Sequence, residues 1–184
     1  MKRSKEIILV SHCILNANSK VEGLSEYSGM VKELVSLIFE RGAGLVQLPC
    51  PEMHVYGIRR WGHVKEQFDT PHFRQESRKI LSPLVDQVED YIKNGYRVLA
   101  VIGIDGSPSC GVFKTCSGNW RGELSTSEGL EDMLSHVSLI EEPGVFMEEL
   151  QNLFINRKLD IPFIALDEMN MSSGMEKIQS ILRS

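Results

Sequence analysis

The chain has 184 residues, 42% hydrophobic and 24% charged, which is enough for one domain with a buried core. A net charge of −5 argues against binding nucleic acid over the whole surface, because phosphate binding needs clustered lysine and arginine. The N-terminal apolar run is too short for a signal peptide or a membrane span, and four cysteines are too few for a secreted disulfide scaffold. We therefore expect a single domain (1–184) of a cytoplasmic protein, with no membrane contact and no stable nucleic-acid partner.

The first predicted element is a strand over Glu6–Val10, a continuous apolar run typical of a parallel strand covered on both faces. A polar loop follows it. Apolar residues at helical spacing predict a helix over 29–41, and a second short strand is expected over 44–48. This strand must stop at Pro49 and Pro51, because proline cannot donate a ladder hydrogen bond.

The middle of the chain is less regular. Residues 53–73 fit no period and indicate a long loop or short helices over the site, such as a lid. A helix follows, beginning either near Arg74 or at the pair Ser82-Pro83, and it ends before residue 95. The third predicted strand, 96–102, leads into a Gly-rich turn that contains a cysteine.

Two helices and a strand complete the predicted elements. A helix is expected from Pro143-Gly144, a strand over 161–166 and a short helix over 175–182. The alternation of strands and helices predicts an α/β fold of the Rossmann-like kind. We expect an open, mostly parallel sheet of about four to five strands with helices on both faces.

Cysteines follow three of the predicted parallel strands. Cys13, Cys50 and Cys110 each come soon after a strand ends. Because the carboxyl ends of parallel strands lie at one edge of a sheet, these three residues should converge there. Cys116 lies in the loop at the same edge.

Three converging cysteines admit several interpretations. They could hold an iron–sulfur cluster with one open iron. They could bind zinc, together with a histidine such as His12 or His54 or with the fourth cysteine, in a protein that is not an enzyme. Cys110 could be a nucleophile whose pKa is lowered by the backbone N–H groups of its turn. Finally, all could be buried structural cysteines.

Three motifs around these cysteines carry a resemblance. The segments V-S-H-C-I-L-N (10–16), L-P-C-P-E (48–52) and G-S-P-S-C-G (106–111) resemble the cysteine motifs of the DUF523 family, which includes the 2-thiouracil desulfurases. The resemblance implies a [4Fe-4S] cluster held by the three motif cysteines. It also implies an open iron that takes the sulfur of a small thiocarbonyl substrate, a thio-nucleobase or thionucleoside, and releases it as sulfide. It assigns no role to Cys116.

Desulfuration needs a base and proton donors near the cysteines. Glu52 is the candidate base; alternatively, it caps a helix or pairs with Arg59. Ser107 and Ser109 are assigned to catalysis as groups that orient water or donate to the cluster, although they could simply be turn-forming hydroxyls.

Other polar residues flank the cysteines. We assign His12, Asn16 and Asp105 to substrate binding. The alternatives are a packing role for His12 at the strand end and an Asx-type turn at Asp105. Trp61 and Trp120 could stack on a base or simply cover the core.

Overall fold

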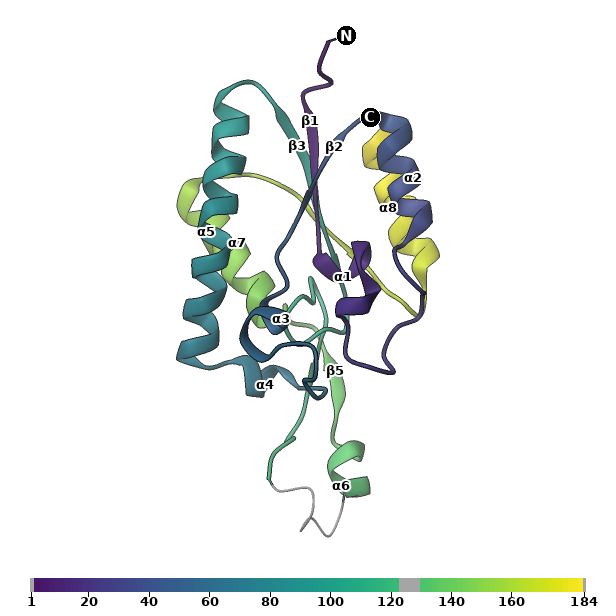
Figure 1. Ribbon diagram of the computed structural model, residues 1–184, viewed down its shortest axis with the longest axis vertical. Coiled ribbons are helices and arrows are strands. Elements are labelled where there is room, and N and C mark those ends of the chain that lie inside the picture. Colours follow the sequence, from purple (N-terminus) through teal and green to yellow (C-terminus); the bar gives the residue numbers. More distant parts are fainter. Residues whose placement is uncertain (1, 123–129, 184) are drawn as a thin grey trace.

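The computed structural model describes residues 2–122 and 130–183 and has a four-stranded sheet at its centre (Figure 1). The strand order is β2-β1-β3-β6, and all three pairings are parallel. The strands are β1 (Glu6–Val10), β2 (Gly44–Gln47), β3 (Arg97–Ile104) and β6 (Phe163–Leu166). The predicted α/β class with an open parallel sheet is confirmed.

The two most apolar strands occupy the middle of the sheet. Residues 7–10 of β1 are all buried, as are residues 99–104 of β3. Strands that are covered on both faces need such uninterrupted apolar runs. By contrast, β2 lies at one edge and is largely exposed, in keeping with its mixed sequence G-L-V-Q.

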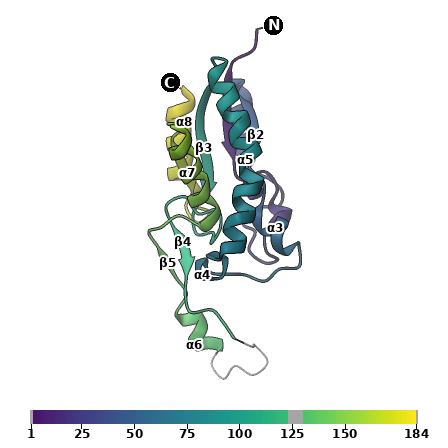
Figure 2. The same cartoon turned by 90° about the vertical axis from the view of Figure 1, so that its left-hand side faces the viewer.

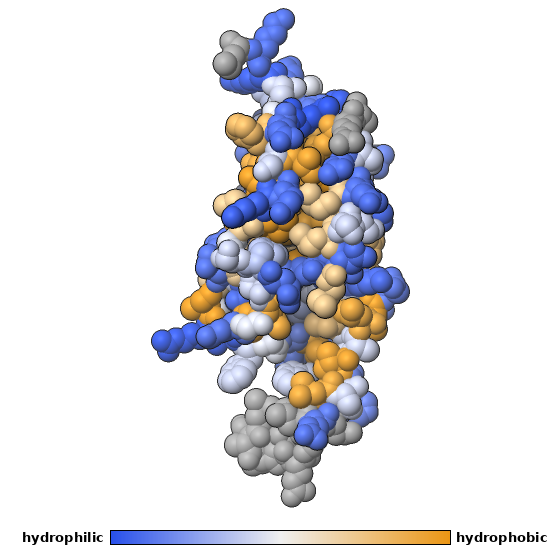
Figure 3. Space-filling model, turned by 90° about the vertical axis from the view of Figure 1, so that its right-hand side faces the viewer, coloured by the Kyte–Doolittle hydropathy of each residue, from blue (hydrophilic) through white to orange (hydrophobic). Residues whose placement is uncertain are grey.

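Helices cover both faces of the sheet, as predicted. On one side α2 (Lys32–Arg41) packs against α8 (Met171–Arg183), and on the other α5 (Pro71–Lys93) packs against α7 (Val145–Arg157) (Figures 1 and 2). Figure 3 faces the side of α2 and α8, where hydrophilic and hydrophobic side chains are interspersed. Within the described ranges, no helix is long and apolar enough to cross a membrane.

Helix starts differ from the sequence expectation more than helix ends. Helix α2 begins at Lys32 rather than residue 29, and its N-cap is Val31, with no side-chain capping bond. Its end is as expected, because Gly42 adopts the left-handed conformation at φ 73°. Helix α5 begins earlier than either alternative, since the Thr70 hydroxyl caps it by accepting from the Phe73 amide at 3.2 Å.

The segments expected to be loops contain short helices. After β1 come α1 (His12–Leu15), which contains Cys13, and a 3₁₀ helix (Ala17–Ser19), so the loop expected over 14–23 is partly helical. The segment 53–73 forms α3 (Pro51–Tyr56) and α4 (Lys65–Phe68), which confirms the alternative of short helices.

A second small core fixes these helices in place. Phe68, Phe73 and Val145 are fully buried, and the two phenylalanine rings stack with centroids 4.5 Å apart. Tyr56 and His63 extend the stack, with ring centroids 5.1 Å apart. These contacts join α3 and α4 to α5 and α7, so the segment packs onto the body of the protein. A role as a lid stays a prediction.

A strand pair and a helix were not predicted. Strands β4 (Thr115–Ser117) and β5 (Ser138–Ile140) pair antiparallel, and α6 (Leu130–Ser135) lies beyond them, away from the sheet (Figure 2). Glu66 of α4 holds this unit, because its carboxylate accepts from the Ser117 hydroxyl and the Gly118 amide.

Candidate functional site

Four cysteines line one cavity of about 350 Å³. Cys13 comes from α1 after β1, Cys50 from the N-cap of α3 after β2, and Cys110 from the turn after β3. Cys116, on β4, lines the same cavity. All four are free thiols. The three cysteines expected to converge therefore meet at a single cavity, together with the fourth.

The turn that carries Cys110 is held by its own backbone and by Ser107. The Ser107 hydroxyl accepts from the Cys110 amide at 3.0 Å, and the Ser107 carbonyl accepts from the Gly111 amide at 3.0 Å. A Cβ on Gly111 would lie 2.1 Å from the Lys114 carbonyl oxygen, so the turn needs glycine there.

The start of α7 fixes the same turn from outside. The carbonyls of Pro108 and Ser109 accept from the amides of Val145 and Phe146 at 3.1 and 3.0 Å. A Cβ on Gly144 would lie 2.5 Å from the Ser109 carbonyl carbon, so the two segments can approach this closely only with glycine. The long-range contact with α7 therefore determines where Cys110 lies.

Burial keeps the cysteine thiols protonated in the free chain. It raises the pKa of Cys13 to about 12, and it raises the pKa of Cys50 as well. Burial also raises the pKa of Cys110 well above its ordinary value, and nearby Cys13 and Cys50 raise it further. The expectation that the Gly-rich turn lowers the pKa of Cys110 is wrong, because burial and the two neighbouring cysteines outweigh the lowering effect of the Ser109 hydroxyl.

A buried carboxylate lies beside the cysteines on the cavity wall. Glu52 accepts from Arg60 Nε at 2.7 Å through Oε2 and from the Ser109 hydroxyl at 2.6 Å through Oε1. Both alternative roles expected for Glu52 are wrong, because its partner is Arg60 rather than Arg59, and Cys50 is the N-cap of α3.

The orientation of two hydroxyls follows from their contacts. Ser109 is buried and has a single hydroxyl proton, which its 2.6 Å contact directs to Glu52 in preference to the Cys110 sulfur at 3.5 Å. Ser107 Oγ lies 3.3 Å from Ser109 Oγ and is then the donor of that pair. Ser107 therefore donates to Ser109, which in turn donates to the Glu52 carboxylate. Ser107 also has the expected turn-forming role, because its hydroxyl accepts from the Cys110 amide.

The three residues assigned to substrate binding differ in position. His12 and Asp105 line the cavity, and burial lowers the pKa of His12. Asp105 Oδ1 accepts from the amides of residues 112–114 at 2.9 to 3.2 Å, which is a loop-holding role. Asn16 is not among the cavity-lining residues; its Oδ1 accepts from Asn18. Substrate binding by these residues stays a prediction.

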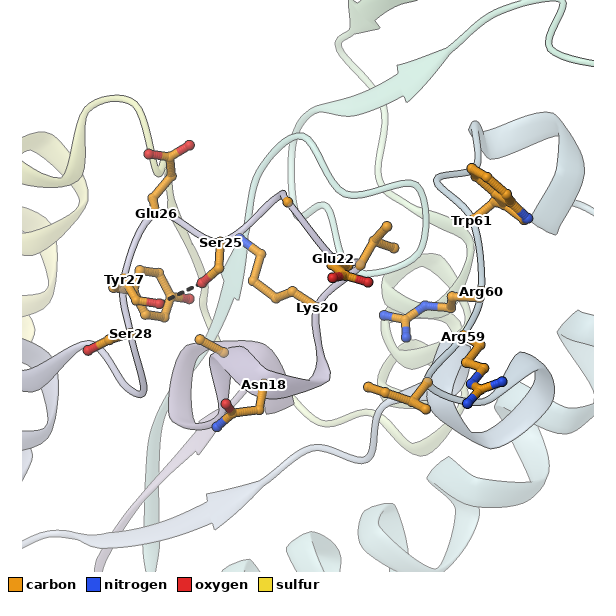
Figure 4. A pocket seen from close by; sticks show the side chains of 14 residues that line it. Asn18, Lys20, Glu22, Ser25, Glu26, Tyr27, Ser28, Arg59, Arg60 and Trp61 are labelled. Atoms are coloured by element: carbon orange, nitrogen blue, oxygen red, sulfur yellow. Dashed lines mark hydrogen bonds between the residues drawn. The ribbon is translucent and has the colours of Figure 1, made fainter.

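An ion pair on the cavity wall was not predicted from the sequence. Lys20 and Glu168 pair through Nζ and the carboxylate, and their side chains are 11% and 18% exposed. The one available signal was the position of Glu168, two residues beyond the end of the fourth predicted strand. Beside the cavity lies a wider hollow of about 1060 Å³, which Lys20 and Arg60 also line, with Trp61 at its rim (Figure 4).

The donor set bears on which metal group the cavity can hold. Among the residues that the structure describes, no three His, Cys, Asp or Glu side chains form a group that could hold a metal ion. Three elements nevertheless present thiols to one cavity, and thiolate is the usual ligand of iron–sulfur clusters. The residues present therefore fit a cluster in their chemistry.

The fold and this cavity define an α/β protein with a site built from thiols. The chain belongs to the family described as "Putative 2-thiouracil desulfurase", whose model matches residues 5–184, so the family resemblance of the cysteine motifs is confirmed. An uncharacterized protein of Methanocaldococcus jannaschii is 40% identical over 112 residues, which cover 61% of this chain and 71% of that protein. No solved structure matches the chain.

Proposed function

We propose that the protein removes sulfur from a small thiocarbonyl compound, a thiouracil-like nucleobase or nucleoside, and releases it as sulfide. The proposed cofactor is a [4Fe-4S] cluster held by Cys13, Cys50 and Cys110. One observation carries the proposal: these cysteines share a cavity with the buried Glu52–Ser109 pair, in a chain of this family. The free thiols agree with a reducing compartment, and we propose the cytoplasm.

The three thiols must lose their protons to bind a cluster. Because burial raises their pKa values, assembly would release protons and would be favoured by higher pH. When bound, the cluster would supply one iron without a protein ligand, a Lewis acid for the soft sulfur of a C=S group.

Glu52 is the proposed general base. Its carboxylate would take a proton from a water molecule as the water oxygen bonds to the thiocarbonyl carbon, and the C–S bond then breaks. Arg60 places a positive charge at 2.7 Å and fixes the carboxylate, while Ser109 orients its other oxygen. The net reaction is a hydrolysis, thiocarbonyl plus water giving carbonyl plus hydrogen sulfide, so it needs no electron donor.

The test is an assay of sulfide release. The purified chain is reconstituted anaerobically with iron and sulfide, freed of excess sulfide and incubated with 2-thiouracil, 4-thiouracil and their nucleosides. We expect sulfide and the matching carbonyl product from at least one of them, and none from the cluster-free chain. A loaded protein that releases no sulfide from any of them would contradict the proposal. Stoichiometric zinc in the native protein, without desulfuration, would instead support a non-enzymatic metal-binding domain.

A further inference from the structure

The cavity wall carries a paired cation and anion that the proposed chemistry does not use. Lys20 follows the 3₁₀ helix and Glu168 follows β6, and both side chains are largely buried against the cavity. They come from opposite ends of the chain, 148 positions apart. Burying two charges has a desolvation cost, which makes their place on a cavity wall informative.

Tyr27 ties this pair to the cysteine site. Its hydroxyl donates to the Cys13 carbonyl at 3.1 Å, and its ring centroid lies 5.5 Å from Lys20 Nζ. Figure 4 shows the Lys20 side chain reaching toward Tyr27. The ammonium and the carboxylate are therefore held in a fixed position relative to Cys13, the first proposed cluster ligand.

Both groups keep hydrogen-bonding capacity beyond their mutual pair. A lysine ammonium has three donors and no acceptor, and an ionised carboxylate accepts at about four positions. Lys20 and Glu168 thus offer a donor and an acceptor side by side, facing the same space as the cysteines. Lys65 and Glu142 form another pair, in which the lysine is also 11% exposed but the glutamate is 58% exposed, and neither residue lines this cavity.

We propose that Lys20 and Glu168 recognise the N–H and C=O that follow the thiocarbonyl in a cyclic thioimide. Glu168 would accept from the ring N–H, and Lys20 would donate to the carbonyl oxygen. Thiouracils carry this sequence of groups, S=C–N(H)–C=O, whereas simple thioamides and thioureas lack the carbonyl. This inference rests on the proposed function and names the substrate class: the pair selects thioimides.

The desulfurated product keeps the recognised edge, so uracil reports binding without any reaction. Titration calorimetry of the anaerobically reconstituted protein would compare uracil with 3-methyluracil, which lacks the N–H. We expect Lys20→Met and Glu168→Met to weaken uracil binding by about 10- to 100-fold, the usual range for a hydrogen bond to a charged group. Lys65→Met is the matched control and should bind uracil like the unchanged chain.

The measured quantity is the ratio of the affinity for uracil to the affinity for 3-methyluracil. A purely structural role of the pair would leave this ratio unchanged. In the unchanged chain uracil should bind more tightly than 3-methyluracil, and in Glu168→Met the ratio should fall toward one. Lys20→Arg should retain uracil binding. The double variant Lys20→Met/Glu168→Met leaves no unpaired buried charge and should still lose the discrimination.

The outcomes separate this inference from the function on which it rests. Sulfide release together with an affinity ratio that is unchanged in Glu168→Met and in the double variant would overturn the role of the pair and leave the desulfurase function standing. A ratio that depends on the pair, in a loaded protein that releases no sulfide from any thiouracil, would support base recognition and overturn desulfuration. A thermal melt of each variant checks that it is folded.

Discussion

Two buried carboxylates in this protein look alike by burial and charge. Glu52 is 9% exposed and pairs with Arg60 at 2.7 Å. Glu149 is 5% exposed and accepts from Arg74 and Arg78, each at 2.8 Å. Both satisfy the rule that a buried charge needs a hydrogen-bonded partner.

Their surroundings separate them. Glu149 bridges α7 and α5 and does not line the cysteine cavity, whereas Glu52 does. Glu52 also accepts from the Ser109 hydroxyl, whose neighbour is the Cys110 sulfur. Burial and ion pairing alone thus do not identify a reactive carboxylate; access to a cavity with sulfur and hydroxyl groups does.

The largest expected difference comes from removing each charge. Glu52→Gln should lower the free energy of unfolding by about 1–3 kcal/mol, because it leaves the buried Arg60 without its counter-ion. Glu149→Gln should lower it by about 1 kcal/mol or less, because Arg74 keeps two other carboxylate partners and Arg78 is 48% exposed. Only Glu52→Gln should lower sulfide release, by about 10²- to 10⁴-fold, the range for general-base catalysis. Urea unfolding and the sulfide assay measure the two effects, and an equal loss of activity in both variants would erase the distinction.

Helix α7 joins the two regions, because its start holds the cysteine turn and its middle carries Glu149. Gly144→Ala should lower the free energy of unfolding by about 1–3 kcal/mol, since the new Cβ would meet the Ser109 carbonyl. It should also reduce the iron retained after reconstitution. Gly29→Ala is the control, because a Cβ there meets nothing within 4 Å. Unchanged melting and iron content in Gly144→Ala would show that the turn does not depend on this contact.

Two buried serines at separate places, Ser109 and Ser77, allow a second comparison. Ser109→Ala should lower sulfide release by roughly tenfold, because Glu52 loses one charge-assisted hydrogen bond. Ser77, on α5, is equally buried, and its hydroxyl has no hydrogen-bond partner among the described residues. Ser77→Ala should therefore leave activity and stability unchanged. Full activity in Ser109→Ala would remove the hydroxyl from the mechanism.

The smallest effect is expected at an ion pair remote from both carboxylates. Arg41 donates to Glu6 through two bonds of 2.7 Å, which lowers the pKa of Glu6 below its ordinary 4.5. This stabilisation is present above the unfolded-state pKa and is lost as the pH falls through the lower folded value. Glu6→Gln should lower the free energy of unfolding at pH 7 by about 1 kcal/mol or less. The difference should vanish in acid, and one that persists there would have another cause.

Much of the fold could be predicted from the sequence, because the strands and helices of the sheet depend on local patterns. The apolar run of β1 specified a central strand, and the alternation of elements specified parallel pairing. Parallel pairing in turn brought Cys13, Cys50 and Cys110 together. Strands β4 and β5 have three residues each, too few for a period to show.

Contacts between distant segments could not be predicted in the same way. Arg59 and Arg60 are adjacent, and only the packing of the loop against the 3₁₀ helix, where Arg60 donates to the Ser19 carbonyl at 2.7 Å, selects Arg60 as the partner of Glu52. The Lys20–Glu168 pair depends on how the first and last loops meet at the cavity. No spacing rule encodes such a contact.

The most direct test of the central claim is the iron content and visible absorbance of the four single Cys→Ala variants after anaerobic reconstitution. We expect Cys13→Ala, Cys50→Ala and Cys110→Ala to be colourless and to bind little iron. Cys116→Ala should be as brown and iron-rich as the unchanged chain. A colourless Cys116→Ala would mean four protein ligands and no open iron, which would contradict the proposed mechanism.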